Sequence, residues 1–243
     1  MEAFISVFRS FGTASNYVSA VKWACLQLRL DMSWLDDAVM QLLKGGRKRD
    51  LRIIGGTVKV QRLLNTTLVT QLVALADRSG QSGFATLLLF SWEFLARVPS
   101  EAVPAECGDA REAMVLPPGR HSAVYIDCHG ALCVRWCRRK HRPRGSLLRR
   151  PCRCAQVGPQ CCAAHRLGAW LKQCKVGERL WSFSASGALG VLRRLLCLLG
   201  VQDAKLYTWK SVRAGRATEM AARGCTLGSI LSVGEWRSVA VLR

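Results

Sequence analysis

Apolar residues recur at helical spacing along the first third of the chain. They stand every three or four positions behind Ser15, at Tyr17, Val18, Val21, Ala24, Cys25 and Leu28. A second repeat of this kind follows Ser33 and runs up to Gly45–Gly46, and a third covers residues 58–76. Serine is a favourable cap at the start of a helix and glycine is a common stop. The pattern therefore predicts three helices within residues 14–78.

A polar stretch separates this helical region from a strongly apolar segment. Residues 77–83 read Asp-Arg-Ser-Gly-Gln-Ser-Gly, a run rich in glycine and serine between two strong helical patterns. We therefore expect a domain boundary there, with a helical domain over residues 1–78 and a second domain over residues 79–243. The second domain opens with an apolar helix, predicted over Phe84–Arg97.

The pattern of the second domain predicts a small sheet among helices. Short strands are expected at Met114–Leu116, Ala123–Ile126 and Ala131–Trp136, and residues 127–130 between the last two end in glycine, as a hairpin turn often does. Helical spacing then returns in four segments, Cys162–Gln173, Ala188–Leu199, Ser211–Arg223 and Leu227–Val233. The expected fold class is mainly α with a small antiparallel β-sheet.

Composition adds a strong preference for a polyanionic partner. The chain carries 36 Lys and Arg against 16 Asp and Glu, a formal charge of +20, and 50% of its residues are apolar. Nucleic acid is the commonest polyanion, and it is the class of partner that the charge predicts. An anionic membrane surface is the competing interpretation. It would favour one basic amphipathic helix, whereas here the charge is spread over many segments.

The sequence shows no secretory signal pattern and no apolar run of bilayer length. Met1 is followed by Glu2 where a signal peptide has basic residues, and the longest apolar run, Phe84–Ala96, contains Glu93. We therefore expect no membrane partner and an intracellular location, which would be nuclear in a eukaryote.

The densest basic segment lies between Asp127 and Glu178, because no acidic residue falls between those two. Contacts from such a segment to phosphate groups fix a protein on the DNA backbone without reading the base sequence. The arginines expected to make them are Arg138, Arg139, Arg142, Arg144, Arg149 and Arg150.

Four residues at short spacing could hold a metal ion. The 12 cysteines of the chain are not expected to form a disulfide framework in a reducing compartment. Thiolate and imidazole groups suit tetrahedral zinc, and four protein ligands would close a structural site. The candidate ligands are Cys152, Cys154, Cys162 and His165, and Cys161 could replace Cys162. The alternative is a cysteine-rich loop of free thiols with a partly exposed histidine.

Two arginines far apart in the sequence belong to the most specific pattern. Arg97 ends the apolar helix and is followed by a nearby acid, and Arg213 opens another helix in the run Lys210-Ser-Val-Arg213. The element Gly234-Glu-Trp236 follows one helical hairpin later. This arrangement resembles the catalytic domain of tyrosine recombinases, the phage-integrase family, in which a His-x-x-Arg motif opens a helix and a Gly-His or Gly-Trp element follows.

The resemblance implies a role for each matching residue in DNA recombination or integration. Arg97 and Arg213 would bind the scissile phosphate, and Lys140, in the turn of a β-hairpin, would donate a proton to the leaving oxygen. Lys210, which stands where the family has histidine, and Trp236 would support them. That chemistry uses no metal or nucleotide cofactor, so a zinc ion here would be structural.

The nucleophile is the second departure from the family pattern. In tyrosine recombinases the nucleophilic tyrosine follows the Gly-Trp element, which would place it beyond Arg243. Tyr17, Tyr125 and Tyr207 all precede that element. The resemblance therefore implies that the chain as given binds double-stranded DNA, alone or as a homo-oligomer, without strand-transfer activity. A tyrosine restored beyond Arg243 would make it a site-specific DNA recombinase. The alternative is a basic zinc-containing nucleic-acid-binding protein whose arginine spacing matches by chance.

Overall fold

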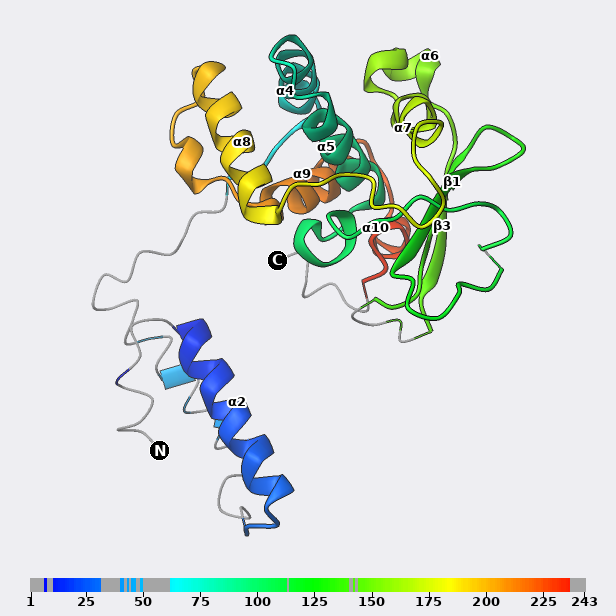
Figure 1. Ribbon diagram of the computed structural model, residues 1–243. Coiled ribbons are helices and arrows are strands. Elements are labelled where there is room, and N and C mark those ends of the chain that lie inside the picture. The colour runs from blue at the N-terminus through cyan, green and yellow to red at the C-terminus, as the bar shows by residue number, and fades with distance from the viewer. Residues whose placement is uncertain are drawn as a thin grey trace. The chain divides into compact units, whose positions relative to one another are not determined.

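The computed structural model describes most of the chain, in two compact units. The described residues are 11–31 and 62–236, except 113, 140, 141 and 143, together with Val7, Met40, Gln41, Leu43, Gly45, Gly46 and Arg49. The units comprise residues 1–60 and 61–243, and each is described by itself (Figure 1). The division falls at Val60 and Gln61, and so differs from the boundary predicted after residue 78.

The first unit contains a helix that is longer than the predicted one. Helix α2 spans Phe11–Gln27 and begins before Ser15, the predicted cap. The Ser15 carbonyl instead accepts a hydrogen bond from the Ser19 hydroxyl, at 2.8 Å, inside the helix. Gly45 and Gly46 are helical and have no positive φ, so the predicted stop at this pair is wrong. Glycine permits a left-handed stop but does not require one. Ser33 lies outside the described residues.

The polar stretch 77–83 connects two helices of the second unit. Helix α4, Thr66–Arg78, is capped by Asn65, whose side-chain oxygen accepts the Leu68 N–H at 2.8 Å. Gly80 takes a φ of 69°, and the Gln81 N–H donates to the Ala76 carbonyl at 2.7 Å. Helix α5, Ser82–Phe94, follows at once and packs against α4. The stretch is therefore a tight turn within one unit.

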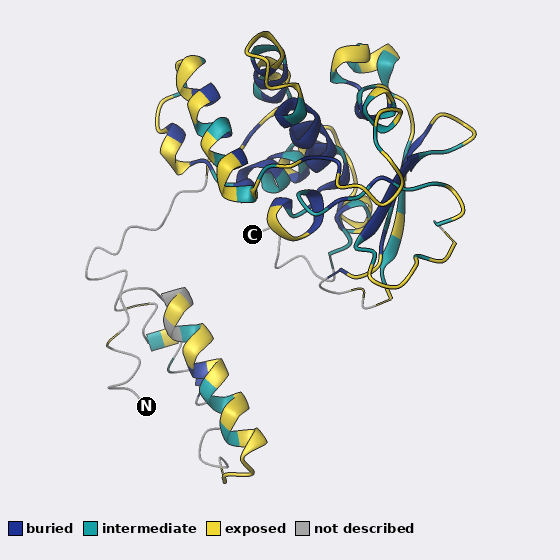
Figure 2. Cartoon of the chain, viewed as in Figure 1, coloured by how far each residue is buried: buried dark blue, intermediate teal, exposed yellow. Residues whose placement is uncertain are grey.

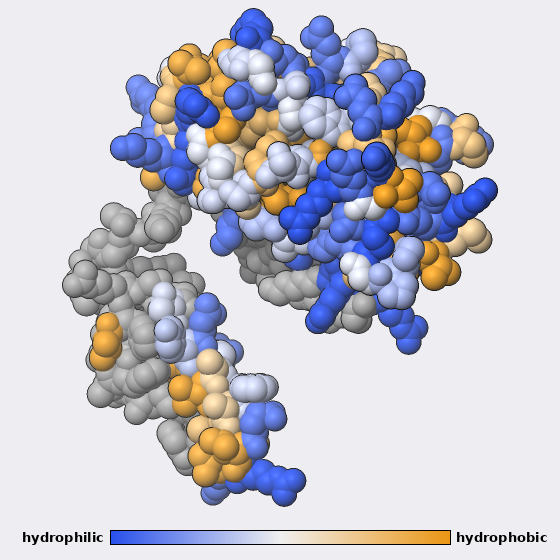
Figure 3. Space-filling model, in the orientation of Figure 1, coloured by the Kyte–Doolittle hydropathy of each residue, from blue (hydrophilic) through white to orange (hydrophobic). Residues whose placement is uncertain are grey.

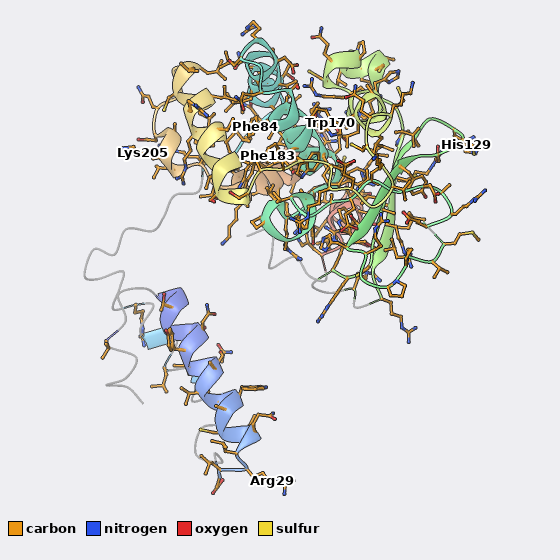
Figure 4. The ribbon with its side chains drawn as sticks, viewed as in Figure 1. Arg29, Phe84, His129, Trp170, Phe183 and Lys205 are labelled. Carbon is orange, nitrogen blue, oxygen red and sulfur yellow. The ribbon has the colours of Figure 1, made fainter. Side chains whose placement is uncertain are left out.

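Helix α5 forms the centre of the core. Residues on nearly all of its sides are buried, as Figure 2 shows, which is typical of a helix that is apolar all round. It contacts α4, helix α7 (Ala163–Leu171) and helix α9 (Trp209–Ala222). Near its start the aromatic side chains of Phe84, Trp170 and Phe183 gather from three segments (Figure 4).

The sheet is a three-stranded antiparallel meander in the order β1-β2-β3. Its strands are β1 (Ser122–Ile126), β2 (Leu132–Trp136) and β3 (Ser146–Arg150). Val134 in the central strand pairs with Val124 on one side and Leu148 on the other. Helix α7 packs against β1 and β2, and α5 contacts β3.

The strand predicted at Met114–Leu116 does not form, and β3 was not predicted. Met114 and Val115 are 81% and 78% exposed in a turn region, with no strand beside them to pair with. A strand needs such pairing for its backbone hydrogen bonds. Strand β3 is rich in arginine, and it forms because β2 offers a free edge.

The other elements of the second unit are short or amphipathic. They are the π-type turn η1 (Val98–Ala102), α6 (Cys154–Val157), the 3-10 turn η2 (Pro159–Cys161), α8 (Ala185–Leu198), the 3-10 turn η3 (Ala204–Leu206) and α10 (Leu227–Gly234). The described structure is thus mainly helical with a small antiparallel sheet, which confirms the expected fold class. Within these described segments, no helix has both the length and the apolar character needed to cross a bilayer.

Candidate functional site

Arg213 is held between helix α9 and the end of α10. A capping box formed by Thr208 and Ser211 starts α9 and places Arg213 in its second turn. The Arg213 Nη2 donates to the Gly234 carbonyl at 2.7 Å, and its Cζ lies 4.6 Å from the centre of the Trp236 ring. A Cβ at Gly234 would meet that ring at 2.5 Å, so only glycine lets Trp236 fold back onto this turn. The Gly-x-Trp element therefore positions Arg213.

Arg97 is fixed at the end of α5 by Glu101. Helix α5 ends at Phe94, and Leu95 takes a left-handed conformation with a φ of 46°. Both the backbone N–H and the Nη1 of Arg97 donate to the Glu101 carboxylate, at 2.9 and 3.0 Å. Burial raises the pKa of Glu101, but Arg139 and Arg97 outweigh burial, and the net pKa is lowered. Glu101 is therefore ionised at neutral pH.

Arg139 lies inside the protein and joins the two halves of this site. It follows β2, is only 5% exposed, and binds Glu101 through Nε at 3.1 Å and Nη2 at 2.7 Å. Its Nη1 donates to Glu235, and its Cζ lies 4.5 Å from the centre of the Trp136 ring. These contacts use its donors internally. This burial does not support a contact between Arg139 and DNA at the protein surface.

The five charged groups form one cluster, which we call the arginine cluster: Arg97, Glu101, Arg139, Arg213 and Glu235. Burial lowers the pKa of Arg213 to about 10, with a further lowering by the charges of Arg97 and Arg139, so these groups lie within electrostatic reach of one another. Three positive and two negative groups leave one net positive charge. The Arg213 Nε is buried and has no hydrogen-bond partner.

The structure brings three of the five predicted catalytic residues together. Arg97 and Arg213 belong to the arginine cluster, and Trp236 packs on Arg213. Lys210 is exposed in the first turn of α9, and no contact joins it to the cluster. Lys140 lies outside the described residues, directly after Arg139.

The six arginines predicted to bind DNA fall into three groups. Arg138, Arg142 and Arg144 are exposed around the connection between β2 and β3. Arg149 is also exposed and is paired with Asp127. Arg150, like Arg139, is turned inward. Its Nε donates to the Glu93 carbonyl at 2.9 Å and its Cζ lies 5.2 Å from the centre of the Phe94 ring, so a DNA contact by Arg150 is not supported either. Hydrophilic side chains cover most of the face of this unit seen in Figure 3.

Neither tyrosine of the second unit belongs to the arginine cluster. Tyr207 is 7% exposed in the core, ahead of α9. Tyr125 is 8% exposed on β1, and burial raises its pKa to about 12. Tyr17 belongs to the first unit. The second unit thus offers no exposed phenol among its described residues.

The four predicted metal ligands converge on one point. The ligand atoms of Cys152, Cys154, Cys162 and His165 all lie within 4.8 Å of one another. The His165 Nδ1 is 2.9 Å from the Cys154 Sγ and 3.4 Å from the Cys152 Sγ, and the Cys152 and Cys162 sulfur atoms are 4.0 Å apart. Tetrahedral zinc with bonds of about 2.0–2.3 Å needs ligand atoms about 3.3–3.8 Å apart. The separations, from 2.9 Å to at most 4.8 Å, lie on both sides of this range, so the four groups could hold a metal ion.

The structure also decides between Cys161 and Cys162. Cys162 is buried and precedes α7, and its Sγ accepts the Arg153 N–H at 3.3 Å. Burial raises the pKa of the Cys162 thiol, but hydrogen bonds from the backbone N–H groups of Arg153 and His165 outweigh it and lower the pKa to about 6. Cys161 is only half-buried, and its thiol is not part of the cluster. Of the two cysteines, Cys162 is therefore the one whose thiol could bind a metal ion with the other three groups.

Sequence reasoning missed the role of Glu235 and the internal role of Arg139. Glu235 is the middle residue of Gly234-Glu235-Trp236, in a left-handed conformation with a φ of 49°, and it also accepts the Ser146 hydroxyl at 2.9 Å. One signal could have indicated it: an acid at the centre of the Gly-x-Trp element, in a chain with only 16 acidic residues.

Comparison of the sequence with protein-family models gives no match, and a comparison with curated proteins gives none either.

Proposed function

We propose that residues 61–243 bind duplex DNA and hold one backbone phosphate in the arginine cluster, as the resemblance to tyrosine recombinases implies. The observation that supports this most is the buried charge imbalance at Arg213. Its Nε has no partner, and the cluster keeps one positive charge after both carboxylates are counted. A buried positive charge without a partner is unfavourable unless an anion pairs with it.

A phosphodiester fits this requirement in charge and in shape. It carries one negative charge, which would neutralise the cluster, and the planar guanidinium fork suits its paired oxygen atoms. Glu101 and Glu235 would keep the three arginines in place before the phosphate arrives. The site is therefore organised in advance for a single anion.

The exposed arginines would extend the contact along the DNA. Arg138, Arg142 and Arg144 lie in the connection between β2 and β3, within five positions of Arg139 in the sequence. They would bind further phosphates without reading the base sequence. We propose binding and not strand cleavage for these residues, because neither Tyr125 nor Tyr207 belongs to the cluster.

We also propose that Cys152, Cys154, Cys162 and His165 hold a structural zinc ion. The donor set of three sulfur atoms and one imidazole nitrogen is typical of closed zinc sites. The ion would tie the segment after β3 to helix α7, where the loop has few apolar side chains to fix it. This is also the feature that favours the second candidate function, a zinc-containing nucleic-acid-binding protein unrelated to recombinases.

The test of DNA binding compares Arg213 on helix α9 with Arg223, the residue that directly follows this helix. Arg213→Gln removes a charge from the cluster, whereas Arg223→Gln removes one from an exposed pair with Glu219 on the same helix. Fluorescence anisotropy with a labelled duplex at several salt concentrations measures affinity and its salt dependence. We expect Arg213→Gln to lower the salt slope by about 0.9, the value of one phosphate contact. Arg223→Gln should leave the slope unchanged. Equal slopes for wild type and Arg213→Gln would contradict the proposal.

A further inference from the structure

A chain of ion pairs runs from the metal ligands to helix α9. Arg153 stands between the ligands Cys152 and Cys154, and its N–H donates to the Cys162 Sγ. Its side chain leaves the loop and binds both oxygen atoms of Glu93, at 3.0 and 3.3 Å. The backbone of Arg153 is thus fixed by the metal ligands, while its guanidinium group acts on α5.

Glu93 joins Arg153 to the helix that carries Arg213. The Glu93 carboxylate also lies 3.6 Å from the Arg216 Nη2, and Arg216 is on α9, one turn after Arg213. The side chains of Glu93 and Arg216 are only 11% and 12% exposed, so water screens this pair weakly. Arg216 also lies with its Cζ 5.6 Å from the centre of the Trp92 ring, and its Nε has no partner.

A further arginine, Arg150, donates a hydrogen bond to the backbone of Glu93. The Arg150 Nε donates to the Glu93 carbonyl, and the Arg150 Nη2 donates to the Val233 carbonyl in α10 at 3.3 Å. Glu93 is therefore the point that links five segments of the second unit: the end of β3, the loop that carries Cys152 and Cys154, and helices α5, α9 and α10. Both helices that position Arg213, α9 and α10, belong to this link.

We propose that metal occupancy controls DNA affinity through Arg153 and Glu93. This inference rests on the proposed function of the arginine cluster. With the metal bound, the loop holds Arg153 on Glu93, so Arg153 and Arg216 share the carboxylate. Without the metal, only the hydrogen bond to the Cys162 Sγ and those within α6 hold the backbone of Arg153, so Arg153 leaves Glu93 and Glu93 pairs with Arg216 alone. The change of partner acts on α9 and moves Arg213 away from its phosphate-binding position.

The experiment measures the affinity of the 243-residue protein for a labelled random-sequence duplex, with zinc bound and after removal of zinc by a chelator. Zinc content is measured by elemental analysis in each sample. Couplings between two sites are about 5–150-fold in affinity, and we expect a loss of at least about 5-fold on zinc removal. Because such coupling is reciprocal, the duplex should tighten zinc binding by the same factor.

Two variants test the connection through Arg153 and Glu93, and a third variant is the matched control. Arg153→Gln and Glu93→Gln should keep zinc and bind DNA with an affinity that no longer depends on it. Arg166→Gln also removes an arginine next to a metal ligand, His165, but Arg166 binds Asp77 and the Thr86 hydroxyl instead of Glu93. Arg166→Gln should therefore keep the zinc dependence. Glu93→Gln keeps the test valid if Arg153→Gln fails to bind zinc.

The outcomes separate this inference from the proposed function. Wild-type protein that binds the duplex equally with and without zinc would overturn the link and leave DNA binding intact. The link would also be overturned if DNA affinity depended on zinc equally in wild type, Arg153→Gln and Glu93→Gln. Wild-type protein that binds no duplex in either state would overturn both proposals.

Discussion

Arg139 and Glu235 are 96 residues apart in sequence and form an ion pair inside the protein. Arg139 follows the central strand of the sheet, and Glu235 follows the last described helix. Through Glu101, Arg139 also reaches Arg97. One buried guanidinium group thus connects the sheet with both arginines of the candidate phosphate site.

The first prediction concerns this buried pair. Arg139→Met leaves Glu101 and Glu235 without their main partner, and breaking a buried pair in this way costs about 3–5 kcal/mol of unfolding free energy. Urea unfolding followed by circular dichroism measures the change. Arg138→Met, at the exposed neighbouring position, is the control and should have little effect. Similar midpoints for the two variants would show that Arg139 does not connect these segments.

The second prediction concerns Gly215 in helix α9. Alanine usually stabilises a helix relative to glycine by about 0.5–1 kcal/mol. A Cβ at Gly215, however, would lie 1.9 Å from the Leu64 carbonyl oxygen, because residue 64 crosses α9 there and its N–H donates to the Ser211 carbonyl. Gly215→Ala should therefore destabilise the protein.

Gly190 in helix α8 is the matched control for this substitution. A Cβ there meets nothing within 4 Å, so Gly190→Ala should stabilise the protein by about 0.5–1 kcal/mol. Thermal unfolding of both variants measures whether each substitution raises or lowers the stability of the protein. A stabilising effect of Gly215→Ala would mean that residue 64 does not approach α9 as described.

The third prediction concerns the metal ligands. We expect one zinc ion per chain in protein purified at neutral pH, measured by elemental analysis. Cys162→Ser should lower the zinc content, because it removes a thiolate of the cluster, whereas Cys161→Ser should not. Zinc affinity should also fall as pH decreases, since the thiolates and the imidazole must lose protons to bind. Equal zinc content in both variants would rule out the assignment of Cys162.

The sequence predicted local features better than the environment of charged residues. Helical spacing found α5, α9 and α10, and the hairpin turn after Ile126 was placed correctly because its glycine signal is local. Nothing local distinguishes Arg139, which is buried, from Arg138, which is exposed. The difference arises from Glu101 and Glu235, which only the folded chain brings to Arg139.

The same reason explains why the sequence alone could not settle the domain division or choose between Cys161 and Cys162. The stretch 77–83 has the composition of a linker, but the apolar face of α4 packs on α5 and α8, and this decides where the unit begins. Cys161 and Cys162 are adjacent and chemically identical. Cys161 ends the turn η2 and Cys162 precedes α7, and only the Cys162 thiol belongs to the candidate metal cluster.

The most direct test of the account follows the Arg213 Nε–H group by NMR while duplex DNA is added to protein with ¹⁵N-labelled arginine. The loss of one signal in Arg213→Lys identifies its resonance. Since this group is buried and has no partner, the account predicts a separate signal that moves strongly when the phosphate binds. An Arg213 signal that stays in place while those of exposed arginines such as Arg142 and Arg144 shift would contradict the claim that the arginine cluster holds a DNA phosphate.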